Sequence, residues 1–169
     1  MAIPLNPYVA GNPVGDSPAF VGRADVPRKV LRVLRRPQDN AIVLYGQRRI
    51  GKTSILQHLA AWLPREGPYH PVYFDLQDKG DWPLGRVLQD LARTIAHTLG
   101  QPDPDLGTDP EAAFRQKWLP AILDDLADGC SLVLLFDEFD VLADPETEQA
   151  AAAFFPVTAK LTYKNFMVS

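Results

Sequence analysis

The stretch AIVLYGQRRIGKTSILQHL, residues 41–59, is an apolar run that breaks into a glycine-bounded loop and then resumes with helical spacing. Its first part, AIVLY (41–45), has the length and composition of a buried strand. The segment ILQHLAAWL (55–63) has the spacing of a helix, and Pro64 is expected to end it. The order strand, loop, helix is the context in which a loop can hold phosphate.

Four residues of this loop match the pattern G-x-x-x-x-G-K-S/T: they are Gly46, Gly51, Lys52 and Thr53. Glycines let the backbone turn so that successive N–H groups point at phosphate oxygens, and the helix dipole reinforces the attraction. Lys52 is expected to reach the β- and γ-phosphates, and the Thr53 hydroxyl to join Mg²⁺. The alternative is an ordinary glycine-rich turn between a strand and a helix. The expected nucleotide contacts here are Gly46, Gln47, Arg48, Arg49, Ile50, Gly51, Lys52, Thr53 and Ser54.

A second motif, LVLLFDEFD (132–140), delivers two acids at the end of a hydrophobic strand. Open α/β sheets bind their ligands at the carboxyl ends of strands. Asp137 is expected to hold Mg²⁺ through its water shell, and Glu138 to act as general base on an attacking water. Without the glycine loop, two acids at this place indicate only a strand that emerges into solvent. With the loop, they favour hydrolysis over kinase chemistry, with Glu138 and Lys52 as catalytic residues.

A third acid, Asp75, ends the strand predicted over HPVYFDL (70–76), on the same sheet edge as Asp137. Two interpretations remain open for it. Asp75 either helps to order water around a metal ion or is a solvated strand end.

The other apolar patterns alternate between helical and strand spacing, which predicts one α/β domain with a parallel sheet. Asp25 is a candidate N-cap for the first helix, and Pro120 is expected to kink the last one. The expected segments are helices over 25–36, 84–95 and 110–126, and a strand over SLVLLF (131–136) that is buried on both faces.

Composition and charge limit the classes of function. The chain has 169 residues, of which 46% are hydrophobic and 22% charged, so it can bury a core of one domain. A net charge of −4 disfavours nucleic-acid binding, although a local basic patch would not show in this sum. The single cysteine, Cys130, and the absence of a signal-like start favour a reduced, cytoplasmic protein. No apolar run reaches the roughly 20 residues of a membrane helix.

Three segments together carry a family resemblance: FVGR (20–23), LYGQRRIGKTSIL (44–56) and LLFDEFDVL (134–142). In this order they resemble P-loop ATPases of the AAA+ and STAND type, in particular prokaryotic ATPases related to the origin-recognition family. The resemblance implies a three-layer, additional-strand P-loop fold that binds ATP or ADP with Mg²⁺. It also implies contacts from Val21 and Gly22 to adenine, and from Arg23 to the base or ribose.

The resemblance also suggests boundaries for the domain. Residues 1–19 are rich in Pro, Gly and Asn and are expected to form an extended arm, and residues 20–169 the P-loop domain. The segment NFMVS (165–169) is expected to be a fourth strand between the first and the third. Related domains continue beyond such a strand to sensor and lid elements, so we expect a domain that is truncated at its C-terminus and hydrolyses ATP slowly.

Three functions are compatible with these patterns. The first is Mg²⁺-dependent ATP binding and slow hydrolysis that switches conformation or assembly, through a protein partner or self-association. The second is a regulatory or interaction domain that holds nucleotide without hydrolysing it. The third is a DNA-binding ATPase like those of the origin-recognition family, which the acidic balance disfavours.

Overall fold

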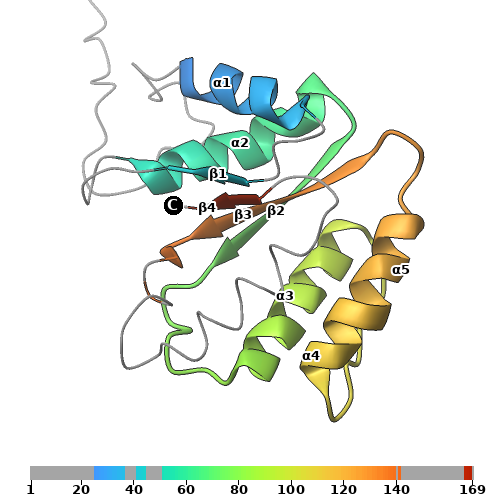
Figure 1. The fold of residues 1–169 in the computed structure, drawn as a ribbon. Helices are drawn as coiled ribbons and strands as arrows, with labels where there is room; N and C mark the ends of the chain where they lie inside the picture. Colours follow the sequence, from blue (N-terminus) through green and yellow to red (C-terminus); the bar gives the residue numbers. More distant parts are fainter. Residues whose placement is uncertain (1–24, 37–40, 45–50, 140, 142–165, 169) are drawn as a thin grey trace, which may run out of the picture.

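The computed structural model of the protein describes residues 25–36, 41–44, 51–139, 141 and 166–168. Within them, strands form one parallel sheet in the order β1-β4-β3-β2 (Figure 1). The strands are β1 (Ala41–Val43), β2 (Tyr69–Asp75), β3 (Ser131–Asp137) and β4 (Phe166–Val168). The parallel sheet predicted from the sequence is confirmed, and so is the position of the fourth strand between the first and the third.

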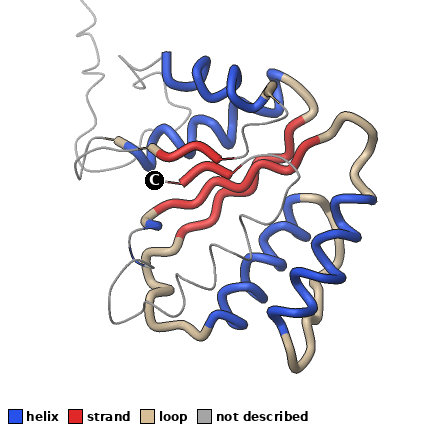
Figure 2. Tube along the Cα trace, in the orientation of Figure 1, coloured by secondary structure: helices blue, strands red, loops and turns tan. Residues whose placement is uncertain are grey.

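Helices lie on both sides of this sheet (Figures 1 and 2). On one side are α1 (Asp25–Leu34) and α2 (Lys52–Glu66). On the other side are α3 (Leu84–Thr98), α4 (Pro110–Ala113), the π-helical turn η1 (Phe114–Trp118) and α5 (Leu119–Asp124). The predicted α/β class is therefore confirmed.

The strand β3 separates two hydrophobic clusters and is buried along its whole length, as its apolar sequence predicts. Val133 and Leu135 pack with α1 and α2, whereas Leu132, Leu134 and Phe136 pack with α3. Side chains alternate between the faces of a strand. The odd-numbered positions of β3 therefore face the α2 side, and this alternation directs the side chain at its last position, 137, to that side.

Two predicted helix boundaries are wrong. Pro64 does not end α2, because the helix continues to Glu66 with the proline in its last turn. A proline there costs a backbone hydrogen bond near the helix end, where the ladder stops anyway. Asp25 is not an N-cap but the first helical residue, and its carboxylate pairs with Lys29 at 2.7 Å. The hydrogen bond from this ammonium lowers the pKa of Asp25.

The helix predicted over 110–126 is interrupted by η1. It starts as expected, because Asp109 accepts the Ala112 N–H at 3.1 Å and Pro110 occupies the first helical position. The Leu119 N–H then bonds to the carbonyl of Phe114, five residues earlier. In a regular helix the ring of Pro120 would clash with the carbonyl four residues before it. A wider π turn directly before the proline accommodates this constraint.

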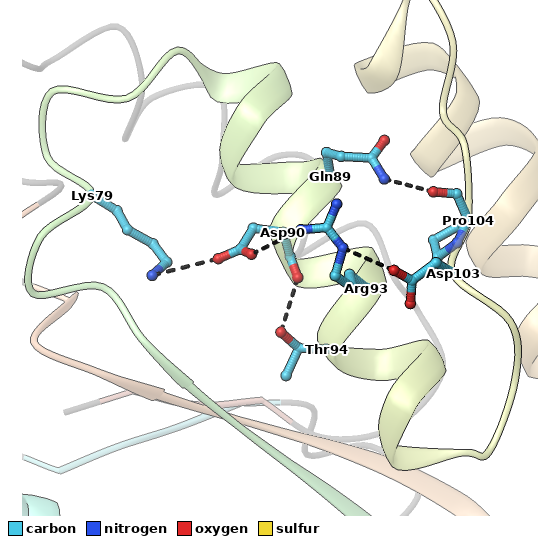
Figure 3. Close-up of polar contacts among 7 residues, drawn as sticks. All are labelled: Lys79, Gln89, Asp90, Arg93, Thr94, Asp103 and Pro104. Atoms are coloured by element: carbon cyan, nitrogen blue, oxygen red, sulfur yellow. Dashed lines mark hydrogen bonds and ion pairs between the residues drawn. The ribbon is translucent and has the colours of Figure 1, made fainter.

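Hydrogen bonds and an ion pair connect the segment 100–106 to α3 (Figure 3). The half-buried Gln89 amide donates to the Pro104 carbonyl at 2.6 Å and accepts the Leu106 N–H at 3.1 Å. Arg93 and Asp103, both exposed, form an ion pair at 3.2 Å. The two contacts differ in burial, so we expect them to differ in their contribution to stability.

Replacing Gln89 by alanine should lower the free energy of unfolding by about 1 to 2 kcal/mol, because the two backbone groups lose their partner in a half-buried place. Arg93→Ala, which removes the exposed ion pair between this residue of α3 and Asp103, should lower the free energy of unfolding by at most about 1 kcal/mol. Urea unfolding of both variants measures the difference. If both variants lose the same free energy of unfolding, Gln89 is not the stronger of the two contacts between the segment 100–106 and α3.

Candidate functional site

The candidate site lies at the edge of the sheet where the parallel strands end. Because β1 runs parallel to its neighbours and leads into α2, this helix must begin at the same edge. Figure 1 shows α2 beginning on the side of the molecule where β2 and β3 end. The Gly-Lys-Thr end of the first motif and the acid pair of the second thus come from segments over eighty residues apart and meet at one edge.

The helix α2 starts directly after a glycine with a left-handed backbone. Gly51 has φ 87°, in the left-handed region that favours glycine. Apart from the neighbouring residues of the chain, a Cβ there would meet no atom of the described residues within 4 Å, so the demand for glycine comes from the backbone angle. Its carbonyl accepts the Ile55 N–H at 3.1 Å. Among the described residues, no side chain caps this helix end, and the first turn of α2 itself contributes no negative charge against the positive end of the helix dipole.

Lys52, Thr53 and Ser54 form the first turn of α2. Lys52 and Thr53 are half-buried, whereas Ser54 is buried. The structure therefore places these three predicted contact residues together at the start of the helix.

Asp137 is a buried carboxylate that two donors hold in place. Its side chain is 2% exposed. The Tyr73 hydroxyl donates to Oδ2 at 2.8 Å, and the Glu138 N–H donates to Oδ1 at 3.0 Å. Both carboxylate oxygens of Asp137 therefore accept hydrogen bonds from within the protein.

The donor to Oδ2, Tyr73, stays protonated at neutral pH. Burial raises the pKa of Tyr73 above its ordinary value, and its hydrogen bond to Asp137 raises it further. The charges of Asp137 and Asp75 act in the same direction, whereas the Gln57 side chain of α2 opposes the shift. Tyr73 was not predicted as a site residue from the sequence, although its place two residues before Asp75 puts it on the strand face of that acid.

Glu138 follows at a backbone position that is unfavourable for most residues. Its φ is 51°, the one positive value among the described residues other than glycine. Its carbonyl accepts the Val141 N–H at 3.1 Å, and Phe139 is buried with its ring 6.0 Å from that of Phe136. These contacts impose a conformation that costs on the order of 1 to 3 kcal/mol and is common at functional sites.

We expect Glu138→Gly to be more stable than Glu138→Ala by about 0.5 to 1 kcal/mol, because glycine adopts positive φ without steric cost. Both variants lack the carboxylate, so their difference isolates the backbone effect. Chemical unfolding measures it. The same pair at His97, exposed in α3, is the control, and there the order should reverse because glycine is the poorer helix former. A Glu138→Gly variant less stable than Glu138→Ala would contradict the left-handed conformation.

Asp75 lies beside Asp137 in the register of β2 and β3, on the predicted edge. Its exposed side chain accepts the Gln77 N–H at 2.9 Å. This contact fixes the turn after β2 and leaves the second carboxylate oxygen open to solvent. Both interpretations of Asp75 remain compatible with this arrangement.

The remaining predicted site residues lie outside the described part of the chain. They are Val21, Gly22, Arg23, Gly46, Gln47, Arg48, Arg49 and Ile50. Their roles stay predictions.

A groove of about 700 Å³ lies between α1 and the second half of α2, away from the candidate site. Arginines line one wall, and a stacked pair of rings, His58 and Trp62, lines the other. His58 comes six residues after Lys52, which is roughly 9 Å along a helix axis. Of the predicted nucleotide contacts, the three that the structure describes, Lys52, Thr53 and Ser54, do not line the groove, so we do not assign it to the nucleotide.

The described residues contain no group of three or more His, Cys, Asp or Glu side chains that could hold a metal ion. A magnesium ion held through phosphates needs only one or two carboxylates, so this finding leaves the role predicted for Asp137 open. None of the described helices is long and apolar enough to cross a membrane.

A parallel α/β sheet with a Gly-Lys-Thr helix start and an acid pair after β3 defines a protein of the P-loop NTPase class. A family model described as an AAA ATPase domain matches residues 19–168. The chain therefore belongs to the AAA ATPase domain family, and membership indicates nucleotide binding and suggests ATPase activity. A comparison with curated proteins found no match.

Proposed function

We propose that this chain binds Mg·ATP or Mg·ADP at the edge where β2 and β3 end and α2 begins, and hydrolyses ATP slowly. In this proposal hydrolysis switches the conformation or assembly of the protein, with a protein partner or a second copy. The observation that carries the proposal is the buried Asp137 carboxylate, fixed by two donors directly before Glu138.

Each site residue has a role in the proposal. Lys52 contacts the β- and γ-phosphates, and the N–H groups of residues 46–54 surround them. Asp137 and Thr53 offer carboxylate and hydroxyl oxygens, which are donors that Mg²⁺ prefers, so they fit this ion. Bound Mg²⁺ would neutralise phosphate charge. Val21, Gly22 and Arg23 contact the adenosine part.

Glu138 is the general base. It accepts a proton from water while the water oxygen bonds to the γ-phosphorus and the bond to the β–γ bridging oxygen breaks. The turn that holds Glu138 supports this role, because it fixes the Glu138 backbone next to Asp137. We expect slow turnover from the isolated chain because arginine fingers, where they operate, contribute about 10³ to 10⁵ in rate, and none is assigned here.

The finer family relations are also part of the proposal. We assign the chain to a three-layer, additional-strand arrangement of AAA+ and STAND type, related to the origin-recognition ATPases. The support is the order of the segments 20–23, 44–56 and 134–142. Residues 1–19 as an arm and 20–169 as the P-loop domain complete this assignment.

Calorimetric titration of the chain with ATP and ADP in Mg²⁺, with phosphate release from the same sample, tests the proposal. Binding with turnover supports it. Tight binding without turnover would favour a regulatory domain that holds nucleotide as a structural ligand. No binding would overturn it.

A second candidate function, DNA binding, is favoured by the groove between α1 and α2. Arg28, Arg32 and Arg35 line it, and among the described residues none of the three makes an ion pair. With Glu66 as the one acid among the described residues that line it, the groove carries a positive excess on an acidic chain, which the net charge conceals. Steeply salt-dependent binding of labelled DNA would support this function, and no binding at low salt would exclude it.

A further inference from the structure

The side chain of Tyr73 in β2 contacts Asp137 in the neighbouring strand β3. In the register of β2 and β3 it lies opposite Leu135, and Asp75 lies opposite Asp137. Its hydroxyl nevertheless bonds to Asp137, two residues further along β3. Tyr73 and Asp137 must therefore point to the same face of the sheet, the face that α2 covers.

We propose that Tyr73 is a positioning residue of the ATPase site, whose hydroxyl sets the orientation of the Asp137 carboxylate and, through it, of the turn that presents Glu138. The inference rests on the proposed function and adds a residue to it. The contacts form one chain: Tyr73 Oη donates to Asp137 Oδ2, and Asp137 Oδ1 accepts the Glu138 N–H. A carboxylate held at both oxygens cannot rotate without breaking one bond.

The hydroxyl, rather than the ring, carries this role. The ring packs at the border of the cluster that α1 and α2 form with β3, and so does the ring of Tyr69 on the same strand and face. Within the described residues, no hydrogen bond of the Tyr69 hydroxyl is present. Tyr69 is therefore a matched control with similar packing and without the bond.

Removing the Tyr73 hydroxyl should weaken the function of Asp137 and Glu138 by an amount that the strength of one hydrogen bond sets. A hydrogen bond to a charged group contributes enough for roughly a tenfold change in an equilibrium constant. In Tyr73→Phe the Asp137 carboxylate loses the donor to its Oδ2, at a residue that is 2% exposed. The loss should fall on steps that use Asp137 and Glu138, and not on contacts of the phosphates with α2.

The experiment compares Tyr73→Phe, Tyr69→Phe and the parent. ADP affinity is measured by calorimetry in EDTA and in Mg²⁺, and ATP turnover on the same samples. We expect all three proteins to bind ADP equally in EDTA, within about twofold, because the hydroxyl bonds to the acid proposed for Mg²⁺ rather than to the phosphate-binding turn of α2. In Tyr73→Phe alone, the gain in affinity from Mg²⁺ and the kcat should each fall about tenfold, with little change in KM.

The possible failures are distinguishable. If the parent binds no nucleotide, the proposed function is overturned and this inference with it. If the parent binds and Tyr73→Phe keeps the same gain from Mg²⁺ and the same kcat as Tyr69→Phe, only the positioning role is overturned. A Tyr73→Phe protein that does not fold, beside a folded Tyr69→Phe, would make the hydroxyl structural and would also overturn it.

Discussion

Lys52→Ala is expected to lower the affinity for ATP and ADP at least about 100-fold. Lys52 is the first residue of α2, beside a glycine whose left-handed backbone turns the chain into the helix. In the proposed function its ammonium contacts the β- and γ-phosphates, and charge-assisted bonds to phosphate are among the strongest in proteins. A 100-fold loss corresponds to about 2.8 kcal/mol of binding free energy. Calorimetric titration with ADP and ATP in Mg²⁺ measures it.

Lys117→Ala is the matched control, because Lys117 is an exposed lysine of η1 on the other side of the sheet. It should bind nucleotide like the parent. Far-ultraviolet circular dichroism of both variants checks that the helices are intact. If Lys52→Ala binds as tightly as Lys117→Ala, the glycine loop is an ordinary strand-to-helix turn and the site lies elsewhere.

The sheet could be predicted because its strands carry their signals locally. The run from Ser131 to Phe136 is too apolar for a half-exposed strand, and every residue of β3 is indeed buried. The ends of helices were harder to predict, because a proline in the last turn costs too little to stop a helix that packing already holds. Leu59 and Leu63 are fully buried and keep α2 in place as far as Glu66.

The candidate site could be predicted only where a single segment carries its residues. Asp137 and Glu138 were found because they follow a buried strand directly. Tyr73 was missed because its bond joins residues 64 positions apart, and the register of β2 against β3 brings them together. The left-handed backbone of Glu138 leaves no trace in the sequence, since glutamate has no preference for it and the surrounding contacts impose it.

These two missed features explain how a short acid pair becomes a site. A carboxylate at a strand end is normally mobile in solvent, so it has no fixed orientation toward a ligand. Here Tyr73 and the backbone of Glu138 fix the Asp137 carboxylate, and Phe139 anchors the turn from the other side. Preorganised groups of this kind lower the reorganisation that a reaction requires, which is the main electrostatic contribution of enzymes.

Glu138→Gln is the variant in which binding and chemistry should separate. We expect ATP affinity within about twofold of the parent, and a turnover lowered at least about 100-fold, because general-base catalysis typically contributes 10² to 10⁴. Glutamine has the shape of glutamate, so the turn and its bond to Asp137 remain. It cannot accept the proton of the attacking water, so the water remains a weak nucleophile. Phosphate release at saturating ATP measures the effect.

Glu66→Gln, at the exposed end of α2, removes the same charge elsewhere and should hydrolyse ATP like the parent. A Glu138→Gln protein that retains full turnover would remove Glu138 from the chemistry and leave hydrolysis to another base. If instead Glu138→Gln binds ATP tightly and stops turnover, the bound state becomes long-lived. The variant would then hold the protein in its ATP form, and any partner or self-association that depends on ATP should become stable enough to measure by sedimentation.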